Sequence, residues 1–245
     1  MSPRRTIATA RRVLQQLGHD RRTVGLLFVV PLVLMGLLAW LYSNSPGVFD
    51  RIGPTLLGMF PFMVMFLVTA MTTLKERSSG TLERLLALPV GKLDIILGYA
   101  LSFGLLAVVQ ATVVSLVAVH VYGMDIAGPQ WFLVVVALAN SLLGTTLGLL
   151  ASAFARTEFQ AAQFMPAFIL PQMLLCGLLV PLAQMPTVLR HVADILPLTY
   201  AVKAMNGVAR EVTLSGNTYM YVGVVLGFAV LAVLLGAATL RRQTR

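Results

Sequence analysis

Six apolar runs, each about as long as one membrane crossing, constrain the fold of this chain more than any other feature. A helix needs about 20 mainly apolar residues to cross the hydrocarbon core of a bilayer. The runs cover residues 24–42, 52–74, 93–120, 131–155, 159–181 and 218–240. We therefore predict an all-α integral membrane protein with six transmembrane helices.

The composition leaves no room for a soluble domain. Only 11% of the residues are charged, whereas soluble globular domains carry about 25%. We interpret 1–245 as a single membrane domain, with a cytoplasmic helix in 1–23, a six-span bundle in 24–240 and a tail in 241–245. The net charge of +9 does not indicate nucleic-acid binding, because no stretch could form a separate basic domain and basic residues collect beside membrane spans.

The distribution of basic residues predicts the orientation of the bundle. Fourteen of the 18 Lys and Arg residues lie before the first span, in 75–92, in the turn at 156–158 or in the C-terminal tail. Cytoplasmic loops carry the excess of Lys and Arg. Both termini are therefore predicted to be cytoplasmic, in a multi-pass protein of the bacterial cell (inner or plasma) membrane.

The N-terminal residues 4–17 show helical periodicity. At 100° per residue, the apolar side chains share an arc of about 120° and the four arginines fall on the opposite side. The apolar residues are Ile7, Ala10, Val13, Leu14 and Leu17. This pattern favours a helix in the cytoplasmic membrane interface, contacting lipid; the alternative is a partly disordered basic flank.

A charged segment, residues 75–92, lies between the second and third apolar runs. Residues 78–80 (Ser-Ser-Gly) are typical of a helix start, and Glu83 follows where an acid complements the positive helix end. Pro89 would end the helix. Three leucines fall on one face: Leu82, Leu85 and Leu86. The segment is predicted to be a short amphipathic cytoplasmic helix, with a solvated loop as the alternative.

The same segment resembles the signature of ABC-2-type permeases, the membrane subunits of ABC exporters. The signature's Glu-Arg pair is present as Glu76-Arg77, its Gly-Thr-Leu-Glu run as Gly80-Thr81-Leu82-Glu83, and its closing proline as Pro89. The six-span layout and the chain length are also similar to that family, so the resemblance covers nearly the whole chain.

The resemblance implies that the segment is a coupling helix that docks on a separate ABC ATP-binding subunit. It also implies a dimer with a second permease copy or a paralogue, with the path at their interface. ATP and Mg would bind in the partner ATPase, because this chain contains no G-x-x-x-x-G-K-[ST] phosphate loop. The expected coupling residues are Glu76, Arg77, Gly80, Thr81, Leu82, Glu83, Arg84, Leu85, Leu86 and Pro89.

Two proline-bounded pieces lie between the fifth and sixth spans, on the predicted external side, and are too short to cross a membrane. Irregular backbone at membrane depth is tolerated only where protein or water satisfies it. The pieces fit either re-entrant helices or an ordinary external loop, and the family resemblance favours re-entrant helices. The expected external gate residues are Pro181, Pro186, Pro197 and Tyr200.

The predicted spans contain neutral polar residues but no acidic residue near the middle. The fifth span is expected to bend at Pro166 and Pro171, and the Gly144/Gly148 spacing favours a close helix contact. Four amides could line a substrate path, although hydrogen bonding between helices explains them equally well. These amides are Gln110, Asn140, Gln163 and Gln172.

These features favour a permease subunit that exports an amphipathic or hydrophobic molecule, such as a drug, an antibiotic or a lipid-like compound. The alternative is a secondary transporter driven by an ion gradient, but coupled carriers usually place ionisable groups at mid-membrane. A scaffold or membrane enzyme is a third class. The sequence contains no metal-binding or catalytic motif that supports an enzyme.

Overall fold

The computed structural model describes residues 3–79 and 92–239, and its regular structure over those residues is helical, as predicted. The elements of the first half are α1 (Pro3–His19), α2 (Arg21–Leu41), α3 (Pro46–Ser78), α5 (Lys92–His120) and α6 (Gln130–Phe154). The elements of the second half are α7 (Glu158–Leu175), the 3-10 turn η1 (Leu182–Gln184), α8 (Thr187–Ile195), α9 (Pro197–Arg210) and α10 (Gly216–Thr239).

Five helices of the described chain are long and apolar enough to cross a membrane. Their qualifying segments are Arg21–Leu41, Pro46–Ser78, Leu97–His120, Gln130–Phe154 and Gly216–Gly236. The expected fifth span, 159–181, corresponds to α7, which is not among the five. The helix ends at Leu175, and Gly177 adopts a φ of 92° that side chains rarely tolerate. Six spans therefore stay a prediction.

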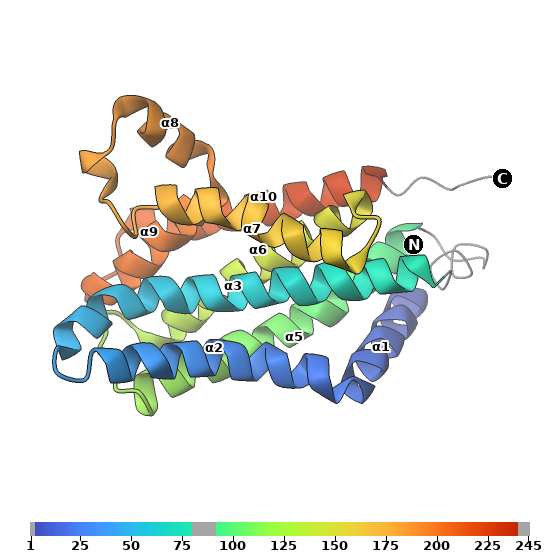
Figure 1. The fold of residues 1–245 in the computed structure, drawn as a ribbon, viewed down its shortest axis with the longest axis horizontal. Coiled ribbons are helices and arrows are strands. Elements are labelled where there is room, and N and C mark those ends of the chain that lie inside the picture. Colours follow the sequence, from blue (N-terminus) through green and yellow to red (C-terminus); the bar gives the residue numbers. More distant parts are fainter. Residues whose placement is uncertain (1–2, 80–91, 240–245) are drawn as a thin grey trace.

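The centre of the bundle is the packing of α3 against α6 (Figure 1). A Cβ atom built on Gly144 would lie 2.2 Å from the carbonyl oxygen of Phe62, and one on Gly148 would lie 2.4 Å from that of Phe66. Only glycine permits so close an approach of two backbones. The predicted close contact at Gly144 and Gly148 is confirmed, and it lies between α3 and α6.

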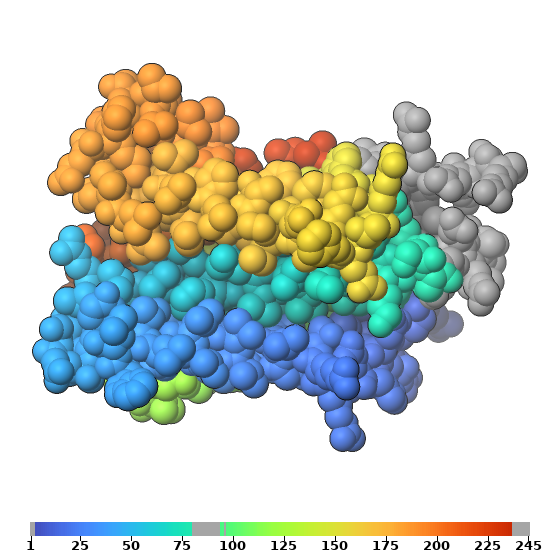
Figure 2. All heavy atoms as spheres, in the orientation of Figure 1, coloured from blue at the N-terminus to red at the C-terminus, as the bar shows by residue number. Residues whose placement is uncertain are grey.

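Two short elements lie at opposite ends of the bundle. Helix α1 crosses the end at which α3 finishes and α5 begins, whereas α8 stands out from the body at the other end (Figures 1 and 2). Ala10, Val13 and Leu17, which the periodicity placed on one apolar face of a lipid-contacting helix, are instead buried in the protein, whereas Ile7 is 59% exposed. The apolar face of α1 therefore packs largely on the protein itself.

Candidate coupling site

The last turn of α3 carries a buried acid, Glu76, whose side chain is only 2% exposed. A carboxylate near the C-terminus of a helix is disfavoured by the partial negative charge of the helix end. Burial adds a desolvation cost unless a cation or hydrogen-bond donor reaches the carboxylate. Glu76 therefore needs partners from other helices.

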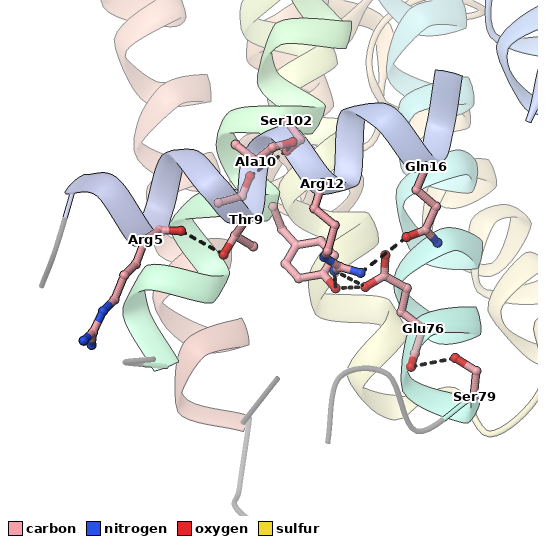
Figure 3. Close-up of polar contacts among 10 residues, drawn as sticks. Arg5, Thr9, Ala10, Arg12, Gln16, Glu76, Ser79 and Ser102 are labelled. Atoms are coloured by element: carbon pink, nitrogen blue, oxygen red, sulfur yellow. Dashed lines mark hydrogen bonds and ion pairs between the residues drawn. The ribbon is translucent and has the colours of Figure 1, made fainter. Parts of the chain in front are cut away.

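Those partners come from α1 and α5 (Figure 3). Arg12 Nη2 of α1 lies 2.8 Å from Glu76 Oε2, and the hydroxyl of Tyr99 of α5 donates to the same oxygen. Arg12 also donates to the Tyr99 hydroxyl at 3.1 Å, so the three side chains form one cluster. The Arg12–Glu76–Tyr99 cluster ties α1, α3 and α5 together at one point.

The cluster does not satisfy all of its polar atoms. Glu76 Oε1 and Arg12 Nε are buried, and neither has a hydrogen-bond partner within the described parts of the chain. A buried network with unpaired atoms holds less firmly than a complete one, because each unpaired atom keeps its desolvation cost. The cluster thus fixes α1 in place with limited strength.

A second set of contacts brings α1 close to α5. Ser102 donates a hydrogen bond to the carbonyl of Ala10 at 2.9 Å. A Cβ atom on Gly98 would lie 2.6 Å from Cβ of Thr9, which is itself 8% exposed. Small residues one turn apart on α5 therefore let the two helices approach closely. This contact positions Arg12 over Glu76.

Arg77, the residue after Glu76, joins α3 to α6. Its Nη1 atom donates to the carbonyl oxygens of Ser152 at 2.8 Å and Ala153 at 3.0 Å. These carbonyls belong to the last turn of α6, where helical partners are missing. The positive guanidinium also complements the negative end of that helix. The Glu76-Arg77 pair thus fastens the end of α3 to three other helices.

The undescribed residues 80–91 leave from this end of α3 and return at the start of α5. The flanking helices α3 and α5 are joined by the contacts above to each other, to α1 and to α6. Of the expected coupling residues, Glu76 and Arg77 have partners within the chain. Eight lie outside the described residues: Gly80, Thr81, Leu82, Glu83, Arg84, Leu85, Leu86 and Pro89. The docking of the segment on an ATPase stays a prediction.

Sequence reasoning missed the roles of Arg12 and Tyr99. It placed Arg12 on the polar face of the N-terminal helix, toward lipid headgroups or a partner. The available signal was Glu76 itself, because an acid in the last turn of a helix needs a nearby cation. Nothing in the sequence singled out Tyr99, since tyrosine at a span end is common.

Three of the four path amides are buried in the bundle. Gln110 donates to the carbonyl of Leu27 at 2.7 Å and so joins α5 to α2. The amide nitrogen of Gln172 donates a hydrogen bond to the carbonyl of Phe168 in the same helix, and its amide oxygen accepts one from the backbone N–H of Leu198 at 3.4 Å. Asn140 is buried on α6, with its amide nitrogen close to the Gly58 position of α3.

The fourth amide, Gln163, is exposed on α7. The structure therefore does not bring the four amides together along one path within this chain. Among the described residues, no three His, Cys, Asp or Glu side chains gather in a way that could hold a metal ion.

The expected gate prolines bound short elements at the far end of the bundle. Pro181 precedes η1, Pro186 precedes α8, and Pro197 is the first residue of α9. The Tyr200 hydroxyl donates to the carbonyl of Asp194 at 2.7 Å and so ties α9 to the end of α8. One face of α9 is buried in the bundle, as a re-entrant piece would be, but a gating role stays a prediction.

With this arrangement established, the chain can be compared with known proteins. A profile of the ABC-2 type transporter family matches residues 5–209. This chain belongs to the ABC-2 type transporter family. The matched residues include most of α1, the Arg12–Glu76–Tyr99 cluster and most of α9, and so they reach both ends of the bundle.

Individual relatives carry ABC transporter names. ABC transporter G family member 20 of Dictyostelium discoideum is 30% identical over 190 residues, which is 77% of this chain and 26% of the relative. The probable multidrug ABC transporter permease YbhR of Escherichia coli K12 is 31% identical over 149 residues, or 60% and 40% of the two chains.

A third relative, the linearmycin resistance permease protein LnrN of Bacillus subtilis, is 25% identical over 185 residues, or 74% of this chain and 48% of the relative. The matches with these three relatives span between about a quarter and a half of each relative's length.

Proposed function

We propose that this chain is the permease part of an ATP-driven exporter in a bacterial cell membrane, with both termini in the cytoplasm. Its cargo is an amphipathic or hydrophobic molecule: a drug, an antibiotic or a lipid-like compound. ATP and Mg bind in a separate ATP-binding subunit, and a second permease copy or a paralogue completes the path. The family membership and the names of the multidrug and linearmycin resistance relatives support this proposal.

One observation carries the coupling part of the proposal. The helices on either side of residues 80–91, α3 and α5, are joined by charged and polar contacts to each other, to α1 and to α6. A ligand or partner shifts a conformational equilibrium only by the difference in its contacts with the two states. A segment held at both ends can pass such a difference into the helices beyond it, whereas a slack loop would absorb it.

In this mechanism, ATP-driven closure of the ATPase subunits pushes on residues 80–91. Glu83 and Arg84 make ionic contacts with the ATPase, while Leu82, Leu85 and Leu86 seat the segment. The load enters α3 through Ser79 and α5 through Lys92. Arg77 passes it to α6, and the Arg12–Glu76–Tyr99 cluster passes it to α1.

Charge reversal at Glu83 tests this proposal. We expect Glu83→Lys to lower cargo-stimulated ATP hydrolysis by about tenfold, the effect of roughly 1.4 kcal/mol of lost contact energy. The measurement uses the permease reconstituted with its ATP-binding subunit in lipid vesicles. Glu158→Lys is the matched control, because it makes the same charge change in another predicted cytoplasmic connection and should leave ATP hydrolysis unchanged.

If the Glu83→Lys permease inserts normally and its cargo-stimulated ATP hydrolysis is unchanged, residues 80–91 do not take part in the mechanism. The same vesicles test the ion-gradient alternative. Cargo movement driven by an imposed pH or sodium gradient, without ATP or the ATPase, would replace the exporter by a secondary transporter.

A further inference from the structure

A large hollow opens at the elbow where α1 turns into α2, beside the last turns of α3. Its volume is about 540 Å³, and six of its seven lining residues are polar or charged, although the apolar parts of their side chains make up much of its wall. The lining residues are Gln16, Leu17, His19, Asp20, Arg22, Thr72 and Lys75. None of them belongs to the Arg12–Glu76–Tyr99 cluster, so the coupling contacts do not explain this hollow.

Two exposed cations line the hollow. Arg22 in the first turn of α2 and Lys75 in the last turn of α3 are exposed, and neither side chain has a hydrogen bond or ion pair within the described residues. The one acid of the lining, Asp20, accepts hydrogen bonds from the backbone N–H and hydroxyl of Thr23 at 3.2 and 2.8 Å, and its charge also interacts with that of Lys75. With two cations against one acid, the lining keeps an excess of positive charge. The hollow therefore offers positive charge to an anion.

Helix α2 continues from the hollow as an apolar stripe. At 100° per residue, the stripe residues fall within about 80° of one another. The stripe starts beside Arg22 and consists of Leu26 (58% exposed), Val29 (54%), Val33 (51%), Leu37 (51%) and Trp40 (77%), all on the same face as Arg22. At 1.5 Å per residue, Arg22 and Trp40 lie about 27 Å apart along the helix, close to the thickness of the hydrocarbon core.

The two ends of the stripe place the hollow relative to a membrane. Trp40 is the residue type that gathers at membrane surfaces, and Arg22 lies about one hydrocarbon thickness away. With Trp40 at one surface, Arg22 and the hollow lie at headgroup level on the other. A ligand in the hollow would have its charge beside Arg22 and Lys75 and its apolar part against Leu26 and Val29.

We propose that this hollow binds the phosphate headgroup of an anionic phospholipid, with the acyl chains lying along the apolar stripe of α2. A free phosphate ion shares the headgroup chemistry but would gain nothing from the stripe. The lipid would bridge α2 and α3 at the base of α1, so it would brace the elbow. This inference concerns lipid binding alone and does not depend on the exporter proposal.

The test compares phosphatidylglycerol, phosphatidylcholine and inorganic phosphate as ligands of the full chain. Protein purified in mild detergent is titrated with each, and binding is followed by the rise in its thermal unfolding temperature and by lipid retained per protein. We expect phosphatidylglycerol to bind more tightly than phosphatidylcholine, and inorganic phosphate to give no rise at millimolar concentration. Arg22→Gln and Lys75→Gln should each weaken phosphatidylglycerol binding by about fivefold.

Arg21→Gln is the matched control, because Arg21 is exposed on the same helix turn but does not line the hollow. It should bind phosphatidylglycerol as the unchanged protein does, and Arg22→Lys should keep most of the affinity. If the unchanged protein retains phosphatidylglycerol and phosphatidylcholine equally, the proposal is overturned. An equal loss in Arg21→Gln would also overturn it, because it would indicate general charge attraction. Stabilisation by inorganic phosphate alone would reassign the hollow to a soluble anion.

Discussion

Two of the contacts that hold helix α3 differ in character. Midway along its length it meets α6 through the glycines 144 and 148, where backbone touches backbone. At its last turn it meets α1 and α5 through the Arg12–Glu76–Tyr99 cluster, where charged and polar side chains make the contact. The glycines of the first contact have no side-chain torsion angles, whereas the second contact depends on the long, flexible side chain of Arg12.

This difference separates a fixed part of the molecule from an adjustable one. Membrane helices associate through close packing of small residues, and such a contact tolerates almost no displacement. An ion pair with unpaired atoms can rearrange at lower cost, because water or another partner can replace a lost contact. The bundle is thus fixed where it is apolar and adjustable where it meets residues 80–91.

The largest effect should come from breaking the fixed contact. We expect Gly144→Ala to lower the free energy of unfolding by about 3 kcal/mol, because the new Cβ would overlap the Phe62 carbonyl and push α3 away. Unfolding in mixed detergent micelles measures the change. Gly227→Ala on α10 is the matched control: nothing lies within 4 Å of its Cβ position, so it should be neutral or slightly stabilising. Similar stability losses in both variants would refute the glycine contact.

A smaller effect is expected at the adjustable contact. Arg12→Ala leaves the Glu76 carboxylate buried without its cation, which costs about 3–5 kcal/mol in a fully buried pair. Arg12 is 32% exposed, so about 2 kcal/mol is expected here, measured by the same unfolding assay. Adding Glu76→Gln should restore part of the loss, because the unpaired charge is gone. Arg11→Ala, on the exposed neighbour, should change little; an equal loss there would argue against the cluster.

The smallest effect concerns Asp20, which begins α2 beside the adjustable end. Its hydrogen bonds from Thr23 hold the pKa of the carboxyl below its ordinary value. The cap therefore contributes its stability above about pH 4, and loses it as the pH falls through the lowered pKa. Asp20→Ala should cost about 1 kcal/mol near pH 7 and less in acid. Asp20→Asn should keep the cap without the pH dependence; if it shows the same dependence, another group is responsible.

The fixed contact could be predicted from the sequence, and the adjustable one could not. The Gly144/Gly148 spacing repeats at one helical turn, so the local pattern indicated a close neighbour. The periodicity of α1 likewise placed Ala10, Val13 and Leu17 on one apolar face, although it predicted lipid rather than protein against that face. Both are periodic patterns within a single helix, and they do not depend on the arrangement of distant segments.

The Arg12–Glu76–Tyr99 cluster joins residues 64 and 87 positions apart in the chain, and no local pattern links them. The sequence assigned Glu76 to an ATPase contact, while the structure buries its carboxylate under α1. The end of the fifth apolar run differs from the end of α7 for another reason. The run continues to residue 181, but the left-handed backbone at Gly177 follows directly after the helix ends. An apolar run alone does not show where the backbone turns.

The prolines of α3 divide this helix into unequal parts. Pro54 and Pro61 both precede Phe62, where the close backbone contact with the α6 glycines begins, and no proline lies between Phe62 and Ser78. Proline removes a helical hydrogen bond and permits a bend. The segment from Phe62 to Ser78 can therefore move as one rigid helix about its close contact with α6. A push at its Ser78 end would bend α3 near Pro54 and Pro61, where α9 packs and the external mouth is predicted to lie.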